Sequence, residues 1–303
     1  CTLSLFLHFS WIDPWTLVAD RGGAEDCTKQ LVEYHMTEDT MTDHGVDYLS
    51  NALGNSLGEY GYGAYFSQLS DKMLYTIRSD GTHIHSYDLQ SLAWQQLTPA
   101  IPISSALVSC LASSQTPRPR LYVAGGFNTE TLDRLQVLDI DTMSWLSNTS
   151  SMQYGRESHG CIVVDDILWT MGYVKEIEAI NITDIQSTEW KQAGTLPVEL
   201  REFAVVAVDA LIYIIGGLVG YDPVDTVYTI DTKTSLVALH EDQLPILMLN
   251  MAFIIVDGTL YGFGGWGGNK TDQTTQDRWY SYDLHTAHGL QCHTVDLFER
   301  SIL

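Results

Sequence analysis

Residues 211–231 read LIYIIGGLVGYDPVDTVYTID and carry the pattern on which the rest of the chain is built. The opening apolar run is too short for a helix and stops at Gly216 and Gly217, a pair that can adopt positive φ without a Cβ clash. Further on, the run VYTID alternates with a period of two, as a half-buried strand does. This stretch therefore predicts two β-strands joined by a turn.

The same pattern recurs along the chain at a nearly constant distance. Its aromatic position is occupied, at spacings of 47, 47, 44 and 48 residues, by Tyr75, Tyr122, Trp169, Tyr213 and Tyr261. A parallel series of aspartates stands at Asp88, Asp139, Asp184, Asp231 and Asp283. The apolar run ends in a full glycine pair at three of these places: Gly125 with Gly126, Gly216 with Gly217, and Gly264 with Gly265.

A tryptophan follows the first three of these aspartates by six residues, at Trp94, Trp145 and Trp190. An apolar run closed by a glycine pair, an aromatic-rich strand and a spaced tryptophan, repeated about every fifty residues, together resemble the kelch repeat. Kelch repeats are known as four-stranded blades of a β-propeller. The resemblance covers residues 62–298, and the glycine pair is incomplete or missing at residues 171–173 and 78–81.

The resemblance implies an all-β fold, a kelch-type β-propeller of six four-stranded blades, five of them clear and the first degenerate. We expect residues 62–303 to supply the clear blades. Residues 1–61 are expected to hold the degenerate first blade, followed by an acidic loop over Thr37–Asp47, with the whole chain forming one domain. Blades contact only their neighbours, so we expect the ring to be closed by pairing of the chain ends.

The chain of 303 residues is strongly acidic, with 38 Asp and Glu against 15 Lys and Arg and a formal net charge of −23. Phosphate binding needs a basic patch, so we expect no nucleic-acid partner, and acidic membranes are disfavoured for the same reason. Such acidity serves solubility, or the binding of cations or of a basic partner. No apolar run reaches about 18 residues and no basic segment precedes Leu3–Phe9, so neither membrane insertion nor an intact signal peptide is expected.

Three Asn-x-Ser/Thr sequons begin at Asn148, Asn181 and Asn269. Asn148 and Asn269 fall in predicted loops, whereas Asn181 lies near the end of a predicted strand. Lysines are few, and threonines and tyrosines are many, which suits a secreted surface. We therefore expect an extracellular or cell-surface glycoprotein.

The five cysteines lie far apart and form no CxxC pair, so metal ligation by cysteine is poorly supported. Cys1 and Cys27 flank the predicted first blade and Cys292 lies in the predicted last strand, so a disulfide among them could join the ends of the ring. Cys110 and Cys161 lie in apolar runs, where they fit buried unpaired thiols as well as disulfides. An odd number of cysteines leaves one thiol free or paired between chains.

Two short motifs look like catalytic or cofactor-binding sequences, but both lack the required context. Residues 54–58 fit GxSxG, yet the sequence after them is too glycine-rich for the helix that a nucleophile elbow needs. Residues 262–267 fit GxGxxG, but no helical period follows them, and the repeat already explains these glycines. We therefore expect no catalytic residue and no cofactor.

Histidines supply the remaining candidates for a metal site. His83 and His85 share one strand face, and three more gather near the end of the chain, at His285, His288 and His293. A metal site would need them to converge with a carboxylate, and packing is the simpler interpretation. Copper radical oxidases do use kelch-type propellers, but their crosslinked Cys and Tyr with two His ligands has no assignable match here. We expect no metal site.

The segment between the aromatic and the aspartate positions varies most between repeats, with lengths of 13, 17, 15, 18 and 22 residues. Scaffolds vary where they contact partners, so we expect these loops to form the binding surface, with Trp266 in it as a loop plug or a contact residue. The resulting hypothesis is a non-enzymatic extracellular scaffold or adhesion module that binds protein or glycan partners or assembles with itself. The alternatives are a secreted oxidase or lyase that acts at the channel mouth, and an intracellular kelch adaptor.

Overall fold

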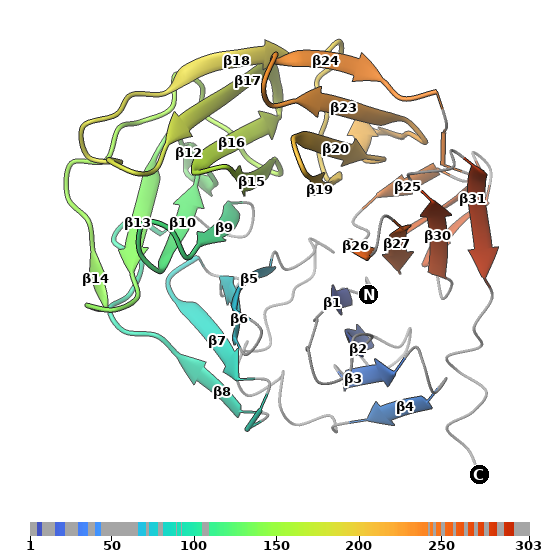
Figure 1. Cartoon of the computed structure of the whole chain (residues 1–303), viewed down its shortest axis with the longest axis horizontal. Coiled ribbons are helices and arrows are strands. Elements are labelled where there is room, and N and C mark those ends of the chain that lie inside the picture. The colour runs from blue at the N-terminus through green and yellow to red at the C-terminus, as the bar shows by residue number, and fades with distance from the viewer. Residues whose placement is uncertain are drawn as a thin grey trace.

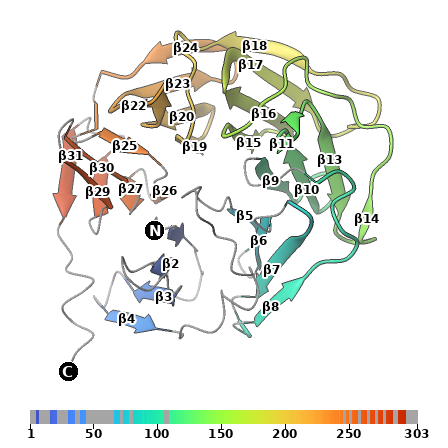
Figure 2. The ribbon, with the colours of Figure 1, turned by 180° about the vertical axis from the view of Figure 1, so that it is seen from behind.

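The computed structural model describes residues 81–249 apart from short gaps at 89, 92, 105–108, 242 and 245–246. Outside that range it describes strands between residues 5 and 77 and between 252 and 293. Every described element is a β-strand, and the strands form a ring of sheets around a central axis (Figure 1 and Figure 2). No helix of the described part is long and apolar enough to cross a membrane. The expected all-β propeller fold is confirmed.

The described strands form six four-stranded antiparallel sheets that follow one another along the chain, and each is one blade. Blade 1 is β1 (Leu5–Leu7), β2 (Thr16–Arg21), β3 (Gln30–His35) and β4 (Thr40–Asp43). Blade 2 is β5 (Phe66–Ser70), β6 (Met73–Ile77), β7 (Ile84–Asp88) and β8 (Ala93–Gln96). Blade 3 is β9 (Cys110–Ser114), β10 (Arg120–Ala124), β13 (Leu135–Asp139) and β14 (Ser144–Trp145).

The second half of the chain supplies three more blades of the same kind. Blade 4 is β15 (Gly160–Val164), β16 (Ile167–Gly172), β17 (Val174–Asn181) and β18 (Lys191–Thr195). Blade 5 is β19 (Ala204–Val208), β20 (Leu211–Ile215), β23 (Val227–Asp231) and β24 (Leu236–Leu239). Blade 6 is β26 (Ala252–Val256), β27 (Thr259–Phe263), β30 (Trp279–Asp283) and β31 (His288–His293).

The first strand of each blade lines the centre of the ring (Figure 1). Strand β9 lies against β5 and β15, β15 lies against β19, β19 against β26, and β26 against β1. The contact between β1 and β26 brings the first and last blades together. Each described blade consists of strands from one stretch of chain, so among the described residues the ring closes through the contact between β1 and β26 and not through a shared sheet. The predicted pairing of the chain ends themselves falls on residues outside the described part.

The second strand of a blade carries the continuous apolar run because both of its faces are covered. In β10, Tyr122 packs into the core between blades 3 and 4, while Leu121 and Val123 pack toward blade 2. All three side chains are fully buried. A strand covered on both faces reads as an unbroken apolar run instead of an alternating one, which is the pattern seen at each repeat.

Three aspartates of the repeat series end a third strand and cap the turn that follows it. Asp231 accepts hydrogen bonds from the amides of Lys233 and Thr234 at 2.8 and 3.0 Å, and Asp139 accepts one from the amide of Thr142 at 3.0 Å. Asp88 caps its turn in the same way. The amide donors hold the pKa of the Asp231 carboxyl below its ordinary value. The aspartate recurs because the turn needs an acceptor there.

The repeated tryptophans tie a blade to the segment that leads into it. Trp145 donates from Nε1 to the carbonyl of Pro99 at 3.4 Å, and Trp190 donates to the carbonyl of Ser150 at 3.0 Å. Both carbonyls belong to the connection from the preceding blade. The indole therefore holds the entry segment against the outer part of its own blade.

One predicted loop of the N-terminal region is a strand in the structure. The sequence predicts an acidic loop over residues 37–47, but Thr40–Asp43 forms β4, which pairs with β3. This prediction is wrong for these four residues because β3 would otherwise leave an unpaired edge on blade 1.

Candidate functional site

Two kinds of connection emerge on the same side of the ring. Because the four strands of a blade are antiparallel, the link from the second to the third strand and the link to the next blade leave from the same end. We call this side the loop face, and its best described part consists of residues 125–134, 146–159, 172–174, 196–203 and 216–226. It is the side on which the loops of variable length stand.

Several of these loops fold back on themselves as small ribbons. Two-stranded ribbons rise from blades 3 and 5, formed by β11 (Phe127–Asn128) with β12 (Glu130–Thr131) and β21 (Leu218–Val219) with β22 (Asp222–Pro223). Blade 6 carries a three-stranded ribbon of β25 (Leu247–Leu249), β28 (Trp266–Asn269) and β29 (Asp272–Thr275). Strand β22 lies against β25, so the ribbons of blades 5 and 6 are continuous.

The glycine pairs make room for this arrangement. Gly217 has φ +99°, and a Cβ there would lie 2.5 Å from the carbonyl oxygen of Arg201 and 2.8 Å from the Cβ of Phe203. Blade 4 keeps positive φ at both positions without the second glycine, because Gly172 and Tyr173 have φ values of 89° and 68°. Tyr173 thereby places a large side chain where blades 3 and 5 have a glycine.

Backbone hydrogen bonds join the ribbon of blade 3 to the connection that follows it. The Gly126 amide donates to the carbonyl of Arg156 at 2.7 Å, and the Arg156 amide donates to the carbonyl of Leu132 at 3.0 Å. The amide of Met152 donates to the carbonyl of Asp133 at 2.8 Å. These bonds fix the two loops relative to each other.

The same bonding continues toward blade 5. The Tyr173 amide donates to the carbonyl of Leu200 at 2.7 Å. Arg201 and Leu218 exchange two amide-to-carbonyl bonds of 3.0 and 2.8 Å. The Glu202 amide donates to the carbonyl of Ser158 at 3.0 Å, which connects the entry loops of blades 4 and 5. The loop face is therefore one braced surface across three blades.

Tyr173 adds side-chain contacts to the brace. Its hydroxyl lies 3.3 Å from Oγ1 of Thr131, on the ribbon of blade 3. The guanidinium carbon of Arg201 lies 4.8 Å from the centre of the Tyr173 ring, a cation–π contact. One ring thus links loops from three blades.

A buried ion pair anchors the loop that leads into blade 4. Arg156 and Glu178 are both inaccessible to solvent, and Nη2 of Arg156 donates to Oε2 of Glu178 at 2.7 Å. Arg156 Nη1 also donates to the carbonyl of Gly172 at 2.9 Å, and Oε1 of Glu178 accepts from the amide of Gln153 at 2.7 Å. Burial lowers the pKa of Arg156, and the adjacent Glu178 carboxylate opposes that shift.

His159 lies at the end of the same loop and is also buried. Its Cε1 lies 2.7 Å from the position that a Cβ on Gly125 would take. Neither ring nitrogen has a hydrogen-bond partner within the described residues. Burial, together with the charge of Arg156, lowers the pKa of His159 to about 3. The imidazole is therefore neutral at physiological pH.

Exposed aromatic side chains distinguish the loop face from the rest of the described surface. Tyr221 is 97% exposed at the tip of its ribbon, and Phe127 and Tyr154 are 42% and 37% exposed. The other large apolar side chains exposed in the described part are aliphatic: Ile103, Leu211, Leu236 and Leu239. Exposed rings on braced loops are the usual anchors of protein contacts.

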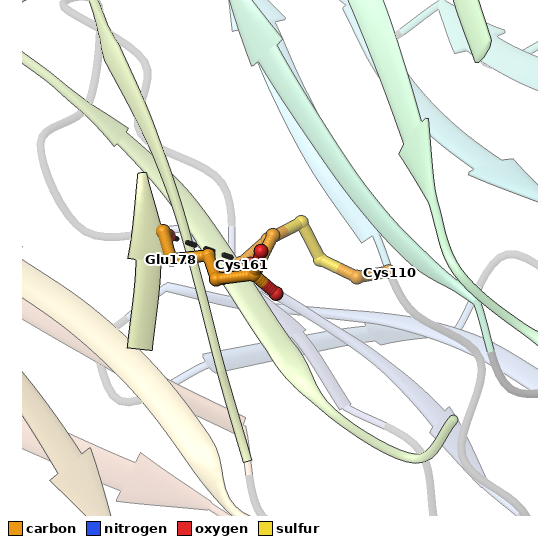
Figure 3. The surroundings of a disulfide bond; sticks show 4 residues. Cys110, Cys161 and Glu178 are labelled. Atoms are coloured by element: carbon orange, nitrogen blue, oxygen red, sulfur yellow. Dashed lines mark hydrogen bonds between the residues drawn. A yellow bond between two sulfur atoms is a disulfide. The ribbon is translucent and has the colours of Figure 1, made fainter. Parts of the chain in front are cut away.

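A disulfide joins the inner strands of two neighbouring blades below this surface. Cys110 of β9 and Cys161 of β15 are bonded, with their Cα atoms 5.8 Å apart (Figure 3). Cys161 lies opposite Thr170, which lies opposite Glu178, so the bridge and the buried carboxylate occupy the same sheet. The disulfide covalently links blade 3 to blade 4 near the centre of the ring.

Comparison with known proteins agrees with this architecture. A family model for the kelch motif matches residues 200–236, which run from the entry loop of blade 5 through its glycine pair to β24. Residues 200–236 therefore form a kelch motif, and this motif spans most of one of the four-stranded blades described above.

Several curated proteins are similar to this kelch chain. Kelch repeat and BTB domain-containing protein 1 of Vaccinia virus (strain Copenhagen) is 23% identical over 217 residues, which cover 67% of this chain and 36% of that protein. The protein of the same name from Ectromelia virus (strain Moscow) is 25% identical over 195 residues, covering 62% and 33%. Beta-scruin of Limulus polyphemus is 27% identical over 153 residues, covering 46% and 16%. The kelch chain therefore spans about a third of the viral relatives.

The sequons of the kelch chain lie at different places. Asn148 is exposed in the loop that enters blade 4, with φ 61°. Asn181 is exposed at the end of β17, where its Oδ1 accepts from the amide and the hydroxyl of Thr183 at 2.9 and 2.5 Å. The sequence predicts loop positions for Asn269 and Trp266, but both belong to β28. That prediction is wrong because the long loop folds back into a ribbon that pairs its backbone groups.

Other predicted positions fall partly or wholly outside the described residues. Cys1, Cys27, Gly264, Gly265 and the motif at 54–58 lie outside them, as do the side chains of Cys292 and Trp266 and of the C-terminal histidines. His85 is buried, and Nδ1 of half-buried His83 lies 2.8 Å from Oγ1 of Thr82. Within the described part, no three His, Cys, Asp or Glu side chains gather as metal ligands do.

The sequence predicts loops of variable length after the second strand of each blade, but it does not predict the exposed rings and the buried ion pair of the loop face. Tyr221 lies in the segment 211–231, directly after Gly220 and before Asp222-Pro223. Glycine, aspartate and proline together indicate a turn, so the sequence could have placed Tyr221 at the tip of a loop. Arg156 and Glu178 carry no local signal, because their pairing depends on how two blades meet.

Proposed function

We propose that the loop face binds a partner protein and that the chain acts as a non-enzymatic interaction scaffold. The observation that carries the proposal is the exposure of Phe127, Tyr154 and Tyr221 on loops that are bonded to one another across blades. A surface that is already ordered loses little conformational entropy on binding. The aromatic side chains that protrude from this surface supply apolar contact area to a partner.

Selection of peptides tests this proposal. A random peptide library displayed on phage is panned against the whole chain, and the selected peptides are measured against Tyr221→Ala and Phe127→Ala. Leu236→Ala is the matched control, because Leu236 is an exposed apolar side chain on the outer strand of blade 5. We expect both loop-face variants to weaken binding while the control does not. Peptides that ignore Tyr221 and Phe127 would place the binding surface elsewhere, and capture on a glycan array instead would assign a sugar ligand.

We further propose an extracellular or cell-surface location. The Cys110–Cys161 disulfide supports it, because disulfides persist in oxidising compartments, and the exposed sequons at Asn148 and Asn181 can accommodate glycans. An intracellular adaptor is the second candidate. The names of the viral relatives favour it, since they join kelch repeats to a BTB domain in one longer protein.

Mass spectrometry of the protein from its natural source separates the two locations. The extracellular proposal expects hexose at Asn148 or Asn181, and resistance of Cys110 and Cys161 to alkylation until a reductant is added. Unmodified asparagines together with two freely alkylated thiols would favour the adaptor.

A further inference from the structure

We infer that the loop face recognises a basic segment of its partner protein, one that presents arginine or lysine side chains. The inference rests on the proposed function and names the chemistry of the partner. It comes from the way in which aromatic rings and charges are distributed over the loops.

Each loop that exposes an aromatic ring also carries an unengaged carboxylate. None of these carboxylates has an ion-pair partner among the described residues; two of the three are exposed and the third is half-buried. The pairs are Phe127 with Glu130, Tyr154 with Glu157, and Tyr221 with Asp222. A ring face and a carboxylate are the two groups that bind a guanidinium or ammonium group best.

The cations of the same loops are mostly engaged within the chain. Arg156 is buried against Glu178, and Nε of Arg134 lies 3.6 Å from Oδ1 of Asp133. Arg201 stacks over Tyr173. Lys175 is the exception, as an exposed cation beside the loop of blade 4. The surface therefore offers carboxylates and ring faces to a partner, and few positive groups.

Charge complementarity excludes the other occupants. An acidic segment would bring its carboxylates against Glu130, Glu157 and Asp222 and meet a chain whose formal net charge is −23. A second copy of the chain would add the same charge again, which opposes self-association on this face. A basic segment is attracted over a distance by the net charge and is then held by the rings.

The panning experiment decides the inference through the charge of the selected peptides and a pair of charge variants. The loop-face variant is Glu130→Gln with Glu157→Gln and Asp222→Asn, which leaves every ring in place. The matched control is Asp141→Asn with Asp165→Asn and Asp209→Asn, three exposed carboxylates at turns on the opposite side of the ring. Both variants change the net charge equally, so long-range attraction is the same in each.

We expect the selected peptides to be net positive and to bind the loop-face variant at least about tenfold more weakly at low salt, with less than a twofold change for the control. Equal losses in the two variants would overturn the inference, because only the overall field would then act. Acidic or uncharged peptides that still depend on Tyr221 would overturn it too, while leaving the proposed function intact. Peptides that are indifferent to Tyr221 and Phe127 would instead remove the proposed function.

Discussion

Arg156 and Glu178 form an ion pair that solvent does not reach, and it joins the loop entering blade 4 to the third strand of that blade. The attraction between two charges taken out of water offsets their desolvation only where the geometry is good and further hydrogen bonds are made. Here the Gly172 carbonyl and the Gln153 amide provide two of those bonds. The pair thus sets the position of the loop that presents Tyr154.

Removing one member of this pair should be costly. Arg156→Met leaves the Glu178 carboxylate buried without its counter-charge, and we expect a loss of about 3–5 kcal/mol in the free energy of unfolding. The double variant Arg156→Met with Glu178→Leu removes both charges, so its loss should be smaller than the sum of the two single losses. Urea unfolding of the three variants measures this. Additive losses would show that the two side chains are not coupled.

Acid should destabilise the protein through His159. Burial holds its folded pKa near 3, whereas an unfolded histidine has its ordinary value near 6.5. Below about pH 6.5 the unfolded chain therefore binds a proton that the folded chain does not, and stability is lost progressively down to about pH 3. The slope from this one group is at most about 1.4 kcal/mol per pH unit.

The variant His159→Gln isolates that contribution, because carboxylates titrate alike in both proteins. Urea unfolding between pH 7 and pH 4 should give a steeper decline for the parent than for the variant. The matched control is His83→Gln, at a half-buried histidine that bonds to Thr82, and the contribution specific to His159 is the difference between the slopes of the two variants. Identical slopes for the parent and His159→Gln would contradict the assignment.

Much of the fold can be read from the sequence because each blade repeats the same physical problem. The apolar run around Tyr122 must be buried on both faces, Asp231 must cap its turn, and Trp190 must bind the entry segment of its blade. These demands are local to one repeat and leave residues at fixed spacings. Five of the six blades and their strand pattern follow from these repeated residues, whereas blade 1 lacks them.

Contacts between blades leave no regular spacing in the sequence. Cys110 and Cys161 are 51 residues apart, which is close to one repeat, and both lie in the first strand of a blade. They can bond because β9 and β15 lie side by side in the ring, and this contact cannot be read from either repeat alone. Tyr173 departs from the glycine pattern but keeps a positive φ, as the glycines at this position do. The sequence shows that this position departs from the glycine pattern, but it does not predict the contacts of the Tyr173 side chain with Thr131 and Arg201.

Two glycines of blade 5 provide a test of the close approach between loops. Gly217→Ala should destabilise the protein by about 3 kcal/mol or more, because positive φ and overlap with the Arg201 carbonyl act together. Gly220→Ala should cost only about 1 kcal/mol, since Gly220 has φ +64° but open space around its Cβ position. Thermal unfolding of both variants measures the difference. Equal effects would mean that strain alone matters and that the loops are not tightly apposed.

The disulfide between Cys110 and Cys161 should make the stability of the ring depend on redox conditions. It closes a separation of 51 residues, and the chain-entropy account assigns such a loop about 4 kcal/mol, within the usual range of about 2–5 kcal/mol. Cys161→Ser should lower Tm, and a reductant should then have little further effect, whereas the parent should lose stability when reduced. Cys110→Ser with Cys161→Ser controls for the leftover thiol and should match the single variant. A parent whose Tm is unchanged by full reduction, with both thiols shown to be alkylated, would mean that packing between β9 and β15 holds the two blades together without the bond.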